Sequence, residues 1–177
     1  YMTEPALGPL DRAFPVDPKL DTAPDTNVFE VDGTKFILLD TYTKNGERSY
    51  FVISRNAHGK RAIDSVADWT NGGDNIFSVD DRKPDKAMSE KHMAYWLNSS
   101  EEGGFLNDAT ENTLPMGIKE YIDKNHVWKT ESTLNGSNVQ TGDYAFTAGL
   151  TLLSAREFQK YSDKIGYGDT GSEWWLR

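Results

Sequence analysis

The fold is decided by residues 28–53, which read VFEVDGTKFILLDTYTKNGERSYFVI. Apolar and β-branched residues gather in three runs, at 28–31, 34–41 and 50–53. The pairs Asp32-Gly33 and Asn45-Gly46 separate these runs and suit the positive φ angles of two-residue hairpin turns. The segment therefore predicts three antiparallel strands in a meander.

Three helices are predicted after the meander. Ser89 is placed to cap the first, in which Met93, Trp96 and Leu97 share one face and which Asn98 ends. The resulting fold class is α+β, an antiparallel meander with two to three helices and long loops.

The second helix carries Pro115 in its first turn, and the third follows Ser154 and Glu157, which match the capping-box spacing. A further strand is expected at 126–130. The predicted core consists of Phe36, Leu38, Phe51, Ile53, Trp96, Leu97, Ile118, Tyr121, Leu152, Phe158 and Trp175.

Residues 1–26 precede this pattern and hold five of the seven prolines. Proline at that density disfavours helices and sheet pairing, so we expect an extended lead-in, with Phe14 and Leu20 able to fasten it to the domain. The domain itself is expected to span 27–177.

Composition narrows the classes of partner. The formal charge is -9, from 19 basic and 28 acidic residues, and no basic patch offsets it, so no nucleic acid is expected as a partner. No apolar run reaches the ~20 residues of a membrane span, so no membrane insertion is expected. The absence of cysteine removes disulfides and thiolate chemistry but leaves the compartment open.

Residues 56–85 form the first candidate binding region, because the strand and helix patterns both stop there. Trp69 lies beside Asn71, Asp74 and Asn75, and an aromatic ring edged by amides and carboxylates is typical of sugar-binding sites. Trp96 and Trp128 have apolar neighbours and are expected to lie in the core.

The same region is rich in carboxylates. Asp74, Asp80, Asp81 and Asp85 supply hard oxygen ligands of the kind that calcium requires, although their spacing does not match the twelve-residue calcium loop. Two interpretations stay open: no cofactor, with a solvated acidic surface, or a bound calcium ion. His58, His92 and His126 are too far apart in sequence to indicate a zinc site.

Several short blocks, taken in order, resemble a family of uncharacterised domains in surface and secreted proteins of Gram-positive bacteria, with a C-type-lectin-like fold. The blocks are Phe36-Ile37-Leu38-Leu39-Asp40, Ala94-Tyr95-Trp96-Leu97-Asn98, Phe105-Leu106-Asn107, Leu152-Leu153-Ser154 with Glu157, and Trp174-Trp175-Leu176-Arg177.

The resemblance implies that further strands follow the Trp-Trp-Leu-Arg block and close the domain. The chain stops at Arg177, so we expect the closing strands to come from a missing segment or a partner chain. Trp174 and Arg177 then become candidate ligand-binding residues. Enzymatic relatives of this fold use a cysteine pair or a His-x-x-x-His-x-Glu arrangement, and this chain has neither.

The sequence thus favours a non-enzymatic, extracellular ligand-binding module for adhesion, at the cell surface or secreted, that recognises a glycan or a protein on another cell. The alternative is a structural or assembly domain that mediates contacts between modules. An enzyme that cleaves glycans with two carboxylates is a distant third, since nothing marks two of the 28 acidic residues as a pair.

Overall fold

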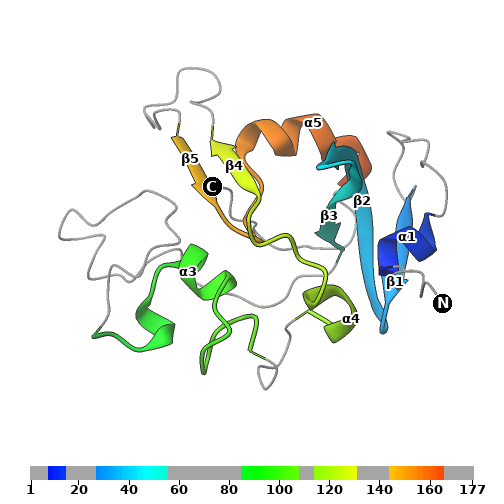
Figure 1. Ribbon diagram of the computed structural model, residues 1–177. Helices are drawn as coiled ribbons and strands as arrows, with labels where there is room; N and C mark the ends of the chain where they lie inside the picture. Colours follow the sequence, from blue (N-terminus) through cyan, green and yellow to red (C-terminus); the bar gives the residue numbers. More distant parts are fainter. Residues whose placement is uncertain (1–7, 15–26, 56–84, 108–113, 131–143, 166–177) are drawn as a thin grey trace. The chain divides into compact units, whose positions relative to one another are not determined.

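The computed structural model describes five stretches of the 177-residue chain, namely 8–14, 27–55, 85–107, 114–130 and 144–165 (Figure 1). The chain divides into two compact units. Unit 1 comprises 1–57, 115–121 and 160–171, and unit 2 comprises 58–114, 122–159 and 172–177. The described elements are mixed α and β with small antiparallel sheets, which confirms the α+β class.

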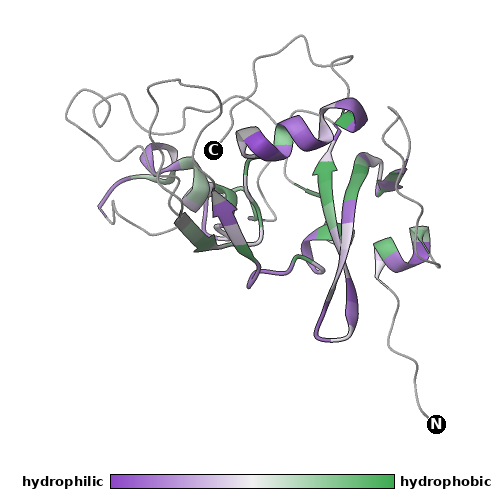
Figure 2. Ribbon diagram, turned by 90° about the horizontal axis from the view of Figure 1, so that it is seen from above, coloured by the Kyte–Doolittle hydropathy of each residue, from purple (hydrophilic) through white to green (hydrophobic). Residues whose placement is uncertain are grey.

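Unit 1 is built on the predicted meander. Strands β1 (Val28–Val31), β2 (Thr34–Lys44) and β3 (Glu47–Ser54) pair antiparallel in the order β1-β2-β3. Both predicted turns are present, with φ of 48° and 84° at Asp32-Gly33 and 53° and 78° at Asn45-Gly46. The β2–β3 hairpin is hydrophilic around its turn and hydrophobic further along (Figure 2).

Strand β2 is buried on both faces. Phe36, Ile37, Leu38 and Leu39 are only 2%, 2%, 0% and 1% exposed, and neighbouring side chains on a strand point to opposite faces. On one face, which we call the strap face, Phe36 stacks on Phe29 of β1 with ring centroids 5.5 Å apart. The opposite face, which we call the α5 face, carries Phe51 of β3, whose ring meets Tyr161 edge-on at 5.6 Å.

A short helix covers part of the strap face. Helix α1 (Pro9–Ala13) forms inside the lead-in, so the expectation of an extended segment is wrong there. Pro9 occupies the first turn, where the missing N–H costs nothing. Phe14 packs edge-on against Phe29 at 5.6 Å, as predicted, while Leu20 lies outside the described residues.

Helix α4 (Met116–Lys119) follows Pro115 as predicted and contacts the first turn of the meander. The Gly117 N–H donates to a carboxylate oxygen of Asp32 at 3.3 Å. Ile118 is buried, but Tyr121 is 48% exposed, so its assignment to the core is wrong. The prediction places Tyr121 on the inner face of a longer helix. Helix α4 ends at Lys119, so helical periodicity does not apply to Tyr121.

In unit 2, the 3-10 helix η1 (Met88–Glu90) precedes α3 (Met93–Leu97). The predicted cap at Ser89 is wrong, because Nδ1 of His92 accepts the N–H of Ala94 at 3.1 Å and begins the helix. Asn98 ends α3 as predicted.

A two-stranded ribbon completes the described sheets of unit 2. The expected strand at 126–130 is present as β4 (Val127–Thr130), and it pairs with β5 (Tyr144–Thr147), which the sequence pattern did not predict.

Helix α5 (Ala155–Ile165) begins with the predicted capping box. The N–H of Glu157 donates to the Ser154 hydroxyl at 3.1 Å, and the N–H of Ser154 donates to the Glu157 carboxylate at 3.0 Å. Residues 155–159 fall in unit 2 and 160–165 in unit 1. Within the described stretches, no helix has both the length and the apolar character to cross a bilayer.

The core prediction is confirmed for Phe36, Leu38 and Ile118, which are buried. The remaining predicted core residues within the described stretches, apart from Tyr121, are half-buried: Phe51, Ile53, Trp96, Leu97, Leu152 and Phe158. Trp175 lies outside the described residues.

Candidate functional site

The strongest polar cluster of unit 1 forms where β2 changes register. The pairing shifts between Leu38, opposite Val52, and Asp40, opposite Phe51, so Leu39 is the extra residue of a β-bulge. Strict alternation would place Asp40 on the strap face with Leu38. The bulge turns Asp40 to the α5 face instead, a known use of bulges.

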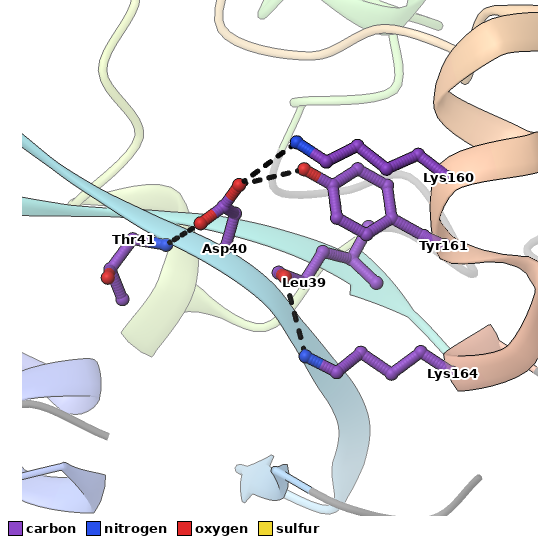
Figure 3. Close-up of polar contacts among 6 residues, drawn as sticks. All are labelled: Leu39, Asp40, Thr41, Lys160, Tyr161 and Lys164. Carbon is purple, nitrogen blue, oxygen red and sulfur yellow. Dashed lines mark hydrogen bonds and ion pairs between the residues drawn. The ribbon is translucent and has the colours of Figure 1, made fainter. Parts of the chain in front are cut away.

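The Asp40 carboxylate collects three donors there (Figure 3). The Thr41 N–H donates to Oδ1 at 2.8 Å, and the Tyr161 hydroxyl donates to Oδ2 at 2.9 Å. The Lys160 ammonium lies 3.6 Å from Oδ2 and 5.1 Å from the centroid of the Tyr161 ring. We call Asp40, Lys160, Tyr161 and Lys164 the Asp40 cluster.

Lys164 occupies the buried side of the cluster. It is 5% exposed, and its ammonium donates to the carbonyl oxygen of Leu39 at 3.4 Å (Figure 3). A bulge takes its extra residue out of the sheet ladder, which leaves that carbonyl available to a side chain. The bulge thus explains both contacts of α5 with β2, through Asp40 and through Leu39.

This geometry suits anchoring rather than catalysis. The cluster contains a single carboxylate, whereas glycoside hydrolysis by the general acid–base route uses two. The Asp40 side chain is 37% exposed and the Lys160 side chain 67%, so this ion pair is largely solvated. The exposed carboxylate can still accept a hydrogen bond from a ligand hydroxyl or amine.

A second polar cluster joins α1 to β3. The Tyr50 hydroxyl donates to Oδ1 of Asp11 at 2.6 Å, and Arg48 donates to the same hydroxyl at 3.1 Å. Arg48 also donates to the carbonyl oxygen of Phe14 at 2.7 Å. Burial, followed by the hydrogen bond to Asp11, raises the pKa of the Tyr50 phenol above its ordinary value.

In unit 2, Asn98 holds a half-buried turn together. Its amide nitrogen donates to the carbonyl oxygens of Ala94 and Leu150, both at 2.9 Å. Its amide oxygen accepts the N–H groups of Gly149 at 3.1 Å and Leu150 at 2.8 Å. Both donors and both lone pairs of this side chain are therefore in use, so Asn98 is a structural residue.

The two tryptophans expected in the core are half-buried, and both make structural contacts. The indole N–H of Trp96 donates to the carbonyl oxygen of Gly103 at 3.0 Å, and its ring lies 5.2 Å from that of Phe105. The indole N–H of Trp128 donates to the carbonyl oxygen of Ala148 at 2.8 Å.

Most of the predicted site residues lie outside the described stretches. These are Trp69, Asn71, Asp74, Asn75, Asp80, Asp81, Trp174 and Arg177. Asp85 is described and lies exposed in a turn before η1. Across the part of the chain that the structure describes, no three His, Asp or Glu side chains converge in a group that could hold a metal ion.

Sequence reasoning missed the Asp40 cluster as a candidate site. Asp40 stands at the end of the Phe-Ile-Leu-Leu block, and Tyr161 lies in the helix predicted after Ser154. The available signal was an acidic residue directly after four apolar residues in one strand. Its partners on α5 lie 121 residues away in sequence, so spacing could not reveal them. A comparison of the chain with protein-family models, curated proteins and solved structures finds no match.

Proposed function

We propose that the chain is a non-enzymatic, extracellular ligand-binding module of a bacterial surface protein, with a C-type-lectin-like fold, that recognises a glycan or a protein on another cell. The observation that carries the proposal is that the polar residues of the motif blocks form hydrogen bonds within the scaffold. Asp40, Asn98 and Glu157 belong to the blocks that suggested the family, and each forms hydrogen bonds that fasten the scaffold.

Recognition is then assigned to the connections between scaffold elements. Residues 56–84 connect β3 to η1, and they carry Trp69, Asn71, Asp74 and Asn75. Binding residues are found disproportionately on segments that a rigid scaffold positions, which supports a role for this connection. The solvated Asp40 carboxylate is a further acceptor in unit 1.

Glycan-array binding of the whole chain tests the proposal, with Trp69→Ala as the first variant. Loss of a stacking tryptophan at a binding hot spot costs about 2 kcal/mol, or roughly 30-fold in Kd. Asn71→Ala should weaken binding, while the exposed Asn125→Ala serves as the matched control and should leave it unchanged. Binding that survives Trp69→Ala and Asn71→Ala would remove this connection from the site.

Calcium is the cofactor that this proposal allows, through Asp74, Asp80, Asp81 and Asp85. Thermal melts with calcium and with a chelator test it, because a ligand at about 100 times its Kd stabilises the folded state by about 2.7 kcal/mol. Identical melts would assign these carboxylates to a solvated surface. The variant Asp85→Asn should reduce the calcium-dependent shift if Asp85 is a ligand.

A further inference from the structure

Residues 8–14, read as GPLDRAF, form a strap that three separate contacts hold to unit 1. Asp11 accepts the Tyr50 hydroxyl at 2.6 Å. The ring of Phe14 lies 5.6 Å from that of Phe29 and 6.5 Å from that of Tyr50. Gly8 lies against the ring of Tyr121, where an added Cβ would come within 3.1 Å of a ring carbon.

Asp11 lies within α1, and Gly8 and Phe14 flank the helix at its two ends. Gly8 contacts Tyr121, and Asp11 contacts Tyr50. Phe14 contacts both Phe29 and Tyr50. We call Phe29, Arg48, Tyr50 and Tyr121 the strap groove. The strap groove thus contacts a glycine, a carboxylate and an aromatic ring of the strap.

Arg48 adds a contact that does not depend on the strap's side chains. Its guanidinium donates to the main-chain carbonyl oxygen of Phe14 at 2.7 Å, where the strap ends. The same guanidinium lies 5.8 Å from the centroid of the Tyr50 ring and donates to the Tyr50 hydroxyl, which orients that hydroxyl toward Asp11. The groove therefore recognises both the side chains and the end of the strap.

The strap joins the meander through residues 15–26. Twelve residues extend to about 40 Å when fully stretched, so this connection is long enough for a strap to reach a second molecule. The contacts described above are made by side chains and by the Phe14 carbonyl oxygen, and a strap of identical sequence from a second chain can make the same contacts.

We infer that the strap groove is a docking site for the residue 8–14 segment of a second copy of this chain, so that two copies can exchange straps. Exchange of an identical element preserves every contact of the closed form and is a low-cost route to association. This inference does not depend on the proposed ligand-binding function. The internal strap competes at an effective concentration in the millimolar range, so exchange grows with protein concentration.

Cysteine pairs test this inference directly, since the chain has no native cysteine. Gly8→Cys marks the strap of one copy and Tyr121→Cys marks the groove of another. The two singly substituted chains are mixed, incubated at high concentration and treated with a short bis-maleimide. Cross-linked dimers of unlike chains are expected, and a tenfold higher protein concentration should raise their yield about tenfold while exchange is rare. Gly8→Cys mixed with Glu47→Cys, at the exposed first residue of β3, is the matched control and should yield few dimers.

A peptide with the unsubstituted strap sequence gives a second readout in the same cross-linking experiment. A synthetic peptide of residues 8–14 should lower the yield of unlike dimers, and the same peptide with Phe14→Ala should not. A third chain carries both Gly8→Cys and Tyr121→Cys and reports cross-linking within one molecule. If only this chain is cross-linked, at every concentration, the inference is overturned. Equal dimer yields with Glu47→Cys, or no effect of the peptide, would overturn it as well.

Discussion

Single polar side chains hold much of the described structure in place, and Asn98 is the clearest case. Its amide satisfies two carbonyl oxygens and two N–H groups, three of the four from residues 149–150. Such a side chain connects the end of α3 to a turn about 50 residues away. The asparagine of the Trp-Leu-Asn block therefore meets a packing requirement of unit 2.

We expect Asn98→Ala to lower the free energy of unfolding by about 3 kcal/mol. Each hydrogen bond contributes roughly 1 kcal/mol, and the backbone groups around the truncated side chain would lose their partners. Asn107→Ala is the matched control, because its amide makes an exposed bond to the Ser100 carbonyl oxygen and should cost less than about 1 kcal/mol. Urea unfolding measures both. Equal losses for the two variants would contradict the structural role of Asn98.

Tyr50 gives a prediction for alkaline pH. Its pKa is raised in the folded chain, first by burial and then by the Asp11 carboxylate. The unfolded phenol loses its proton first, near its ordinary pKa of about 10, while the folded phenol keeps it. The folded state then binds more protons than the unfolded state, so stability falls as the pH rises from about 10 through the folded pKa.

The variant Tyr50→Phe removes this titration, and the other tyrosines titrate in both proteins. Unfolding free energies measured between pH 8 and pH 11 should therefore fall more steeply for the natural chain than for Tyr50→Phe. Parallel curves for the two proteins would show that the folded phenol is not perturbed.

At the scale of elements, the meander was predictable because its signals are local. Asp32-Gly33 and Asn45-Gly46 both adopt the positive φ angles that their residue types favour. The capping box of α5 was predictable for the same reason, since Ser154 and Glu157 lie three residues apart and each accepts the backbone N–H of the other.

Elements that depend on distant partners were not predictable. Strand β5 is four residues long and is defined by its pairing with β4, as in Trp128 opposite Phe146. The bulge at Leu39 is set by the register of β3 and by the contacts of α5. Helix α3 is capped by His92 rather than by Ser89, because a buried imidazole nitrogen accepts the N–H of Ala94. Residue preferences favour serine for this capping role.

The contact of α5 with the bulge can be measured by a double-mutant cycle of Asp40→Ala and Tyr161→Phe. The 2.9 Å hydrogen bond between these side chains is charge-assisted but partly solvated, so we expect a coupling energy of about 1 kcal/mol. Lys160→Ala should cost less than about 0.5 kcal/mol, because its ammonium is largely exposed. A coupling energy indistinguishable from zero would mean that solvent competes fully for Asp40.

Across the whole molecule, the chain returns to unit 1 twice after leaving it. Residues 115–121 and 160–171 join the first 57 residues, so a unit that begins the sequence is completed by segments from its second half. A small sheet with apolar faces gains stability when another element packs against those faces. Within unit 1, α5 supplies Tyr161 against Phe51 and Lys164 against Leu39 on the α5 face.

Two truncated chains isolate this contribution. A chain ending at residue 159 loses the part of α5 that contacts β2, whereas a chain ending at residue 165 keeps it, and both lack residues 166–177. The six residues 160–165 supply one aromatic contact and three polar contacts, so the longer chain should be about 2–4 kcal/mol more stable. Hydrogen exchange of the β2 amides measures the difference.

The expected pattern is specific to one strand. Amides of Ile37 and Leu38 should be protected in the chain ending at residue 165 and exchange rapidly in the chain ending at residue 159, because the α5 face of β2 is then open to water. Tyr161→Ala in the full chain should reproduce part of this loss without any truncation. If the β2 amides were equally protected in both truncated chains, the meander would fold without α5. The Asp40 cluster would then contribute nothing measurable to the stability of unit 1.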